Sequence, residues 1–182
     1  MKEESLKANS IFNALRTLMS VLFPLITFPY ASRVLGPAGI GKVNFSSSIV
    51  SYFLMIAMLE IPNYGIREAG KYKNDKEQLS KFVKEVLSIN LISSAIAYLV
   101  LFAAIFFIPN LFEYRVLIIV SSVSILFSVI GLDRLFYALE ELKSVAIRSF
   151  VFQIVSLVLL FSFVKSKDDT IKYALIAVIS SV

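Results

Sequence analysis

The sequence contains no cysteine and no histidine, and only 17% of its 182 residues are charged. Without thiols and imidazoles, these residues form no disulfide and supply no thiol nucleophile or imidazole base, and they lack the usual zinc ligands. Several classes of enzyme are excluded for this stretch of chain. We therefore expect a protein that is not an enzyme and that carries no cofactor.

Apolar residues dominate instead. They make up 58% of the chain, and the mean hydropathy is +0.81. A helix needs roughly 20 mostly apolar residues to cross a bilayer, and such runs recur between short charged or Pro/Gly-marked stretches. The fold class predicted is all-α, a polytopic transmembrane helix bundle. We expect full spans at Asn9–Tyr30, Val43–Ile61, Val83–Ile108, Val116–Leu132 and Val145–Val164, with the start of a sixth near Tyr173.

The last apolar run, YALIAVISSV, reaches Val182 after about half the length of a span. We therefore expect residues 1–182 to be a fragment of a longer protein.

The distribution of Lys and Arg predicts the orientation in the membrane. If the spans alternate, twelve of the eighteen basic residues lie on the side of the N-terminus, which the positive-inside rule places in the cytoplasm. The basic residues flank membrane spans, so the net charge of +5 requires no nucleic acid. The N-terminal run carries Asn13 and Arg16 and does not read as a cleavable signal peptide. We expect a multi-pass membrane protein with its N-terminus in the cytoplasm.

Each span carries a stripe of polar or small residues on one face. In the first span the stripe has helical spacing and includes Pro24. The residues of the stripes are Asn9, Asn13, Arg16, Ser20 and Thr27; Asn44, Ser48 and Ser51; Ser121, Ser124, Ser128 and Gly131; and Ser149, Gln153 and Ser156. Such stripes allow close helix packing in almost every polytopic protein, and they can also line a polar path. Both interpretations stay open for the serines.

Arg16 lies several residues inside the first span. A guanidinium at that depth must snorkel to the interface, pair with an acid, or face a hydrated cavity. Two interpretations remain, snorkelling toward the cytoplasm and lining a cavity that attracts an anionic ligand.

Pro24 and Pro29 each remove a backbone donor and free the carbonyls of Ser20 and Leu25. Broken helices of this kind are common in transporters. The stretch LGPAGIGK then predicts a tight external hairpin, in which Gly36, Gly39 and Gly41 are free to adopt positive φ. Pro24, Pro29 and Gly36 are candidate hinges, although a merely bent helix fits the pattern as well.

Four segments resemble one family in their sequence order. They are FPLITFPYASRVLGPAGIGKVNFSSSIVSYF, YGIREAGKY, FYALEELKSVAIRS and LFSFVKSKDDTIKYA. Together they are similar to the N-terminal part of the polysaccharide flippases, in the multidrug/oligosaccharidyl-lipid/polysaccharide exporter superfamily. The resemblance implies a multi-pass transporter of the bacterial cytoplasmic membrane. Such a transporter moves polyprenyl-diphosphate-linked oligosaccharide across that membrane, by alternating access, for surface polysaccharide biosynthesis. It also implies two lobes, of which residues 1–182 would form the single membrane-embedded N-terminal lobe. Polysaccharide polymerase and glycosyltransferases are the partners that the resemblance implies.

Such a substrate suggests specific roles for residues of the polar stripes. A diphosphate needs cations, and Arg offers a planar fork of donors, whereas sugars need amides and hydroxyls. The resemblance therefore implies Arg16 as the diphosphate contact and Arg148 as a second candidate for an anionic group. Residues expected along the sugar path are Asn9, Asn13, Ser20, Asn44, Ser48 and Gln153.

Two features depart from the family pattern. Glu60 stands where a small residue is common, and it fits either the inner interface near Arg67 or a titrating site in the membrane. The stretch LDRLFYALEELK lacks the tryptophan of the family, which weakens any role for Asp133 and Arg134. Coupling to a proton or sodium gradient would be consistent with the family, but no residue identifies the ion.

Three alternatives remain open. A multidrug extruder for cations would be expected to place acids in its cavity, and the stripe with Arg16 contains none. A membrane-embedded polysaccharide polymerase or glycosyltransferase usually depends on a large external loop, and the external connections here are short. The chain could also be a non-functional truncated fragment. The sequence does not indicate which sugar is carried.

Overall fold

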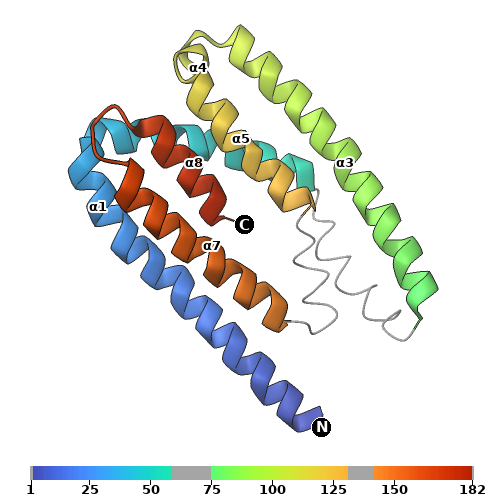
Figure 1. The fold of residues 1–182 in the computed structure, drawn as a ribbon. Coiled ribbons are helices and arrows are strands. Elements are labelled where there is room, and N and C mark those ends of the chain that lie inside the picture. Colours follow the sequence, from blue (N-terminus) through green and yellow to red (C-terminus); the bar gives the residue numbers. More distant parts are fainter. Residues whose placement is uncertain (1, 59–74, 131–141, 182) are drawn as a thin grey trace.

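The computed structural model describes the backbone of residues 2–58, 75–130 and 142–181, and the side chains of residues 13–58, 75, 77–129 and 145–181. Helices are the regular structure in these ranges (Figure 1). They are α1 (Lys2–Met58), α3 (Lys76–Phe107), α4 (Pro109–Glu113), α5 (Arg115–Ile130), α7 (Leu142–Phe163) and α8 (Thr170–Ser180). The predicted all-α class is confirmed for the described part of the chain.

Helix α1 is bent at Gly36, the residue within it whose dihedral angles are not helical (φ 71°, ψ 173°). Glycine lacks a Cβ and adopts positive φ without steric cost. Pro37 then begins the second arm, at a position where its missing N–H would have no helical partner and its fixed φ suits a helix. We call residues 2–35 the first arm and residues 37–58 the second arm. Figure 1 shows the two arms diverging from this bend.

The bend corrects the predicted hairpin. Gly36 has positive φ, whereas Gly39 and Gly41 are helical. The second arm therefore begins at Pro37 rather than at Val43, and a single residue replaces the expected loop. Pro24 and Pro29 lie inside the first arm, which continues as a helix through both. Whether any of the three candidate hinges moves stays a prediction.

Length and composition identify fewer candidate spans among the described residues than the five predicted. Three described helical segments are long and apolar enough to cross a membrane, namely Asn13–Met58, Glu77–Phe107 and Val145–Phe163. Arg115–Val129 and Thr170–Ser180 are apolar but shorter. The bend divides the first segment into arms of roughly 33 to 35 Å at the helical rise, each comparable with the hydrocarbon thickness. Five full crossings stay a prediction.

Helix α1 is the element against which the others pack, because it contacts α3, α5, α7 and α8. Its first arm lies alongside α7, and its second arm lies with α3 and α5 (Figure 1). Around the second arm, Val50 and Ala57 pack with Leu101 and Ile125. Near the bend, apolar residues of α1, α7 and α8 form a separate cluster of Ala31, Leu35, Ile40, Leu160, Val164 and Ile176.

The helices bury small polar residues and expose large apolar ones. Ser46 and Ser156 have no exposed surface, and Asn90 is 6% exposed, whereas Leu99 and Phe106 on α3 are more than 70% exposed. A protein in water would pay for such an exposed apolar surface, but lipid chains solvate it at no cost. This distribution is that of a membrane-embedded helix bundle.

Asp169 organises the turn between α7 and α8. One carboxylate oxygen accepts hydrogen bonds from the backbone N–H groups of Lys165 and Ser166, both at 2.9 Å, and the other lies 2.7 Å from the Lys172 ammonium. The Lys172 contact makes the largest contribution and the two backbone donors add to it, so that together they hold the pKa of Asp169 well below its usual range. Nearby, the Tyr30 hydroxyl donates to the Val164 carbonyl at 2.9 Å, which joins the first arm to the same turn.

We predict that Gly36→Ala lowers the free energy of unfolding by about 1 kcal/mol or more, because an L-residue at positive φ is strained. The space around Gly36 is open, so the cost would come from the backbone and not from a clash. Thermal unfolding in detergent measures the effect. Gly41→Ala is the matched control, since Gly41 is helical with equally open surroundings and alanine favours helices. Equal stabilities of the two variants would contradict the prediction.

We predict that Asp169→Ala lowers the melting temperature and that the loss depends on pH. A carboxylate whose pKa is depressed by folding stabilises the fold above the ordinary aspartate value of about 4, and that contribution is lost as the pH falls toward the depressed pKa. The difference in Tm between wild type and variant should therefore be full at neutral pH and narrow in acid. Asp168→Ala, at an exposed neighbouring position, is the control. An equal loss of Tm in the two variants would contradict the prediction.

Candidate functional site

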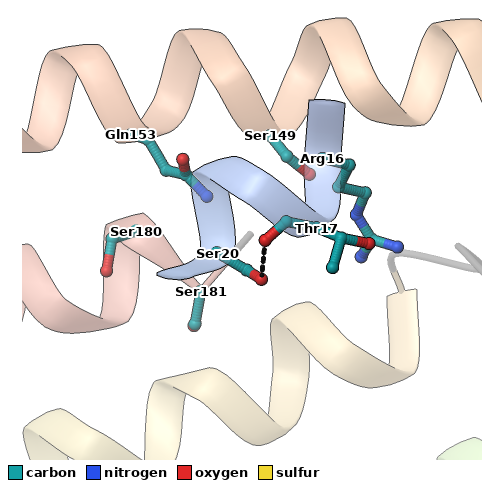
Figure 2. A pocket seen from close by; sticks show the side chains of 7 residues that line it. All are labelled: Arg16, Thr17, Ser20, Ser149, Gln153, Ser180 and Ser181. Atoms are coloured by element: carbon teal, nitrogen blue, oxygen red, sulfur yellow. Dashed lines mark hydrogen bonds between the residues drawn. The ribbon is translucent and has the colours of Figure 1, made fainter. Parts of the chain in front are cut away.

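A polar pocket of about 320 Å³ lies where the first arm of α1, α7 and the end of α8 meet. We call it the Arg16 pocket. Its lining residues are Arg16, Thr17, Ser20, Ser149, Gln153, Ser180 and Ser181 (Figure 2). Figure 2 shows the side chains of Ser149 and Gln153 extending from α7 toward the α1 segment that carries Arg16. Helices α7 and α8 thus combine their polar faces with that of α1, from which they are far apart in the sequence.

The hydroxyls contributed by α1 are anchored to their own helix. Thr17 donates to the Asn13 carbonyl at 2.9 Å, and Ser20 donates to the Thr17 carbonyl at 2.7 Å. On α8, Ser180 and Ser181 donate to the Ala177 and Val178 carbonyls in the same way. A hydroxyl that has donated its proton still has lone pairs. These side chains can therefore accept hydrogen bonds from a ligand rich in hydroxyl groups.

Gln153 has a buried side-chain acceptor that lacks a hydrogen-bond donor. Its Oε1 atom is buried and has no hydrogen-bond partner among the described residues. A buried acceptor in this condition costs free energy until a donor reaches it. A water molecule or a ligand hydroxyl in the pocket would satisfy it.

The charge of the pocket lining is positive. Arg16 is half-buried, and the other lining residues are serine, threonine and glutamine, without Asp or Glu. A guanidinium in a partly desolvated pocket attracts an anion and can bind a phosphate with two parallel hydrogen bonds. Among the described residues, no group of three His, Cys, Asp or Glu side chains could hold a metal ion.

A second pocket, of about 170 Å³, lies between the second arm, α5 and α8. We call it the serine pocket, because its polar lining consists of Ser47, Ser51, Ser121, Ser124 and Ser181. Ser181 lines both pockets. The two spaces are therefore neighbours at the end of α8, and together they form a run of hydroxyls that begins at Arg16.

The structure brings together three of the eight residues predicted to bind substrate, namely Arg16, Ser20 and Gln153. Asn44 and Ser48 are exposed on the second arm and lie outside both pockets. Asn13 is exposed and reaches the site only through its backbone carbonyl. Arg148 precedes Ser149 on α7, is partly buried, and does not line either pocket.

The remaining predictions concern residues that the structure does not describe. The side chain of Asn9 and the whole of Glu60, Asp133 and Arg134 lie outside the described residues. Their roles stay predictions.

Sequence reasoning missed several lining residues. Thr17 is adjacent to Arg16 but lies off the stripe, and Ser180 and Ser181 end the apolar run that is predicted as half a span. The sequence predicts Ser48 as a binding residue, whereas its neighbour Ser47 lines the serine pocket. The run of three serines at 46–48 signalled a polar face, but only the packing of the second arm against α5 and α8 decides which serine faces the pocket.

The helices and the pocket define a multi-pass membrane protein with a cationic, hydroxyl-rich site. The family described as "Polysaccharide biosynthesis protein" matches residues 6–182. The chain belongs to this family, which confirms the resemblance to the polysaccharide flippases.

A curated relative is the "Putative O-antigen transporter" of Escherichia coli (strain K12). It is 24% identical over 165 residues, which cover 91% of this chain and 40% of the relative. The chain thus spans two fifths of that protein. No solved structure matches the chain.

We predict that the Arg16 pocket is accessible to water in the membrane. The chain contains no cysteine, so Ser20→Cys should react with a membrane-impermeant maleimide in open membrane sheets, because a hydrated thiol ionises more readily than one in lipid. Val21→Cys is the matched control, since Val21 is the next residue and is 56% exposed on an apolar surface. Equal labelling of both positions would contradict a hydrated pocket.

Proposed function

We propose that the protein transports a lipid-linked oligosaccharide across the cytoplasmic membrane for polysaccharide biosynthesis, and that Arg16 binds the diphosphate of that substrate. The observation that carries this proposal is the position of Arg16. It is half-buried inside an apolar helix and lines a pocket whose other groups are hydroxyls and an amide. The family membership supports the same substrate class.

The chemistry of the pocket matches the two polar parts of such a substrate. A diphosphate crossing a medium of low dielectric constant needs a cation that stays charged, and arginine keeps its proton under all physiological conditions. Sugars need many moderate donors and acceptors. Gln153 offers a buried acceptor, and the serines of the two pockets, which share Ser181, offer further oxygen atoms.

Alternating access would require the elements around the pocket to move. Helix α1 joins the two polar spaces, since its first arm lines the Arg16 pocket and its second arm lines the serine pocket. A change of angle at Gly36 would therefore alter both, and Pro24 and Pro29 would allow further bending of the first arm. Coupling to a proton or sodium gradient is part of the proposal, with Glu60 and Asp133 as the acids near the membrane.

We further propose that these residues form one lobe of a larger transporter. The extent of the match to the relative, 40% of its length, supports this arrangement. The second lobe would then close the polar spaces on the side that the described helices leave open. Partners that synthesise or polymerise the oligosaccharide follow from the same proposal.

The pocket argues against the two alternative activities. A multidrug extruder that binds cations would be expected to present carboxylates, and the described lining of both pockets contains none. A glycosyltransferase or polymerase needs a general base or acid at the reacting sugar, and the same lining supplies no group of suitable pKa.

We predict that Arg16→Gln lowers transport about tenfold or more. Loss of a charge-assisted hydrogen bond costs about 1.5 to 3 kcal/mol, which is a factor of ten or more in binding. In a strain that lacks the native gene, the variant should leave lipid-linked oligosaccharide in the inner leaflet and reduce surface polysaccharide. Arg16→Lys should retain part of the activity, because the charge remains but the bidentate fork is lost.

Arg33→Gln is the control for this experiment. Arg33 is an exposed arginine on the same arm of α1 and lies outside both pockets. The proposal is wrong if Arg16→Gln supports normal surface polysaccharide at normal expression levels.

A further inference from the structure

An apolar groove adjoins the Arg16 pocket on the same pair of helices. It has a volume of about 380 Å³ and is walled by Leu15 and Met19 of the first arm and by Ala146, Ile147 and Phe150 of α7. Arg16, Ser149 and Gln153 line both the groove and the Arg16 pocket. A polar space and an apolar space therefore meet at the arginine.

We propose that this groove holds the first part of the prenyl chain of the substrate while its diphosphate lies at Arg16. The inference rests on the proposed function and deepens it, since it assigns the site at which the lipid part of the ligand leaves the protein. A prenyl diphosphate has its charge and its hydrocarbon on adjacent atoms, so its binding site must change from cationic to apolar within a few ångströms. Arg16 lies at such a boundary.

The walls of the groove are partly exposed, so a bound prenyl chain could extend from the groove into the surrounding lipid. Leu15, Ile147 and Phe150 are 44 to 49% exposed, and the neighbouring apolar residues Leu18 and Val151 are 51% exposed. The groove thus opens on a surface that lipid covers. A long prenyl chain could begin in the groove and continue into the bilayer without crossing a polar segment of the described helices.

We expect the groove to determine where the prenyl chain lies more than how tightly the protein binds the ligand. Lipid tails are as apolar as leucine, so a prenyl chain gains little free energy when it moves from lipid into the groove. What it loses is orientational freedom, and the diphosphate must supply the free energy that offsets this loss. The test should therefore measure where the chain lies and not only how tightly the ligand binds.

The experiment uses the native full-length gene product in phospholipid nanodiscs. The probe is a prenyl diphosphate that carries a photoreactive group near the diphosphate end of its hydrocarbon. After irradiation, mass spectrometry locates the adducts. We expect a several-fold excess of adducts on residues 15–19 and 146–150 over the apolar face of α3, where Leu99 and Phe102 are 73% and 49% exposed and report chance contact with lipid.

Three variants define the result. Arg16→Gln should abolish the excess on the groove and leave the α3 background unchanged, whereas Arg33→Gln should alter neither. Ala146→Phe, which fills part of the groove, should reduce the groove adducts. A second readout reports the polar pocket alone, namely the protection of Ser20→Cys from maleimide by inorganic diphosphate, which Ala146→Phe should leave intact.

The outcomes separate the two proposals. If inorganic diphosphate protects Ser20→Cys in a manner that requires Arg16, but the adducts spread evenly over α1, α3 and α7, the prenyl groove is wrong and the proposed function stands. The same holds if another part of the protein covers the groove and excludes the probe from it. If neither protection nor labelling depends on Arg16, the proposed function fails, and the prenyl groove fails with it.

Discussion

The requirement that a chain in lipid satisfy its own polar groups governs this structure. Water is absent from the hydrocarbon, so every backbone N–H and C=O in the spanning helices must find a partner in the protein. Many hydroxyls follow the same rule, since those of Ser46, Ser94 and Ser122 donate to carbonyls three or four residues earlier in their own helices. Small polar side chains can then be buried between helices, while leucine and phenylalanine face lipid. The Oε1 of Gln153 is one of several buried side-chain atoms, with those of Ser32, Asn90 and Ser156, that have no hydrogen-bond partner among the described residues. Of these four residues, Gln153 is the one that lines the Arg16 pocket, where water or a ligand could reach it.

The bend at Gly36 is the second constraint, because it decides which faces meet. A straight helix of 57 residues would extend far beyond any bilayer, and the positive φ of one glycine turns it into two arms. The first arm then pairs with α7 and the second with α5, so polar stripes that are separate in the sequence come to line neighbouring pockets. Close packing reinforces the bend. A Cβ at Gly39 would lie 2.9 Å from the Leu35 Cβ and 3.3 Å from the Thr170 Cγ2, so the start of the second arm packs tightly against the start of α8.

Composition and hydropathy were enough to predict the helical membrane fold, because these properties depend on the number and spacing of apolar residues. The bend was harder. Three glycines and a proline in LGPAGIGK suggested a loop. A proline favours the first position of a helix, however, so the second arm starts at Pro37 and Gly36 is the one non-helical residue between the arms. The site was predictable only in part. Helical spacing correctly placed Arg16 and Ser20 on one face, and it singled out Gln153 on α7. It could not show that Ser180 and Ser181 would join them, since that depends on how α8 returns toward α1 and α7.

The same limit explains why Asn44 and Ser48 were chosen while Ser47 and Ser51 line a pocket. All four lie on the second arm, and periodicity identifies its polar stripe without its rotation relative to α5 and α8. Arg16 differs because its chemistry restricts its surroundings. A serine can bond to its own helix and face any direction, whereas a guanidinium with five donors must face other polar groups or solvent. A charged residue within a span therefore predicts its environment from the sequence, and a hydroxyl does not. For that reason the environment of Arg16 supports a functional assignment by itself, whereas the serines support one only because they line the pockets next to Arg16.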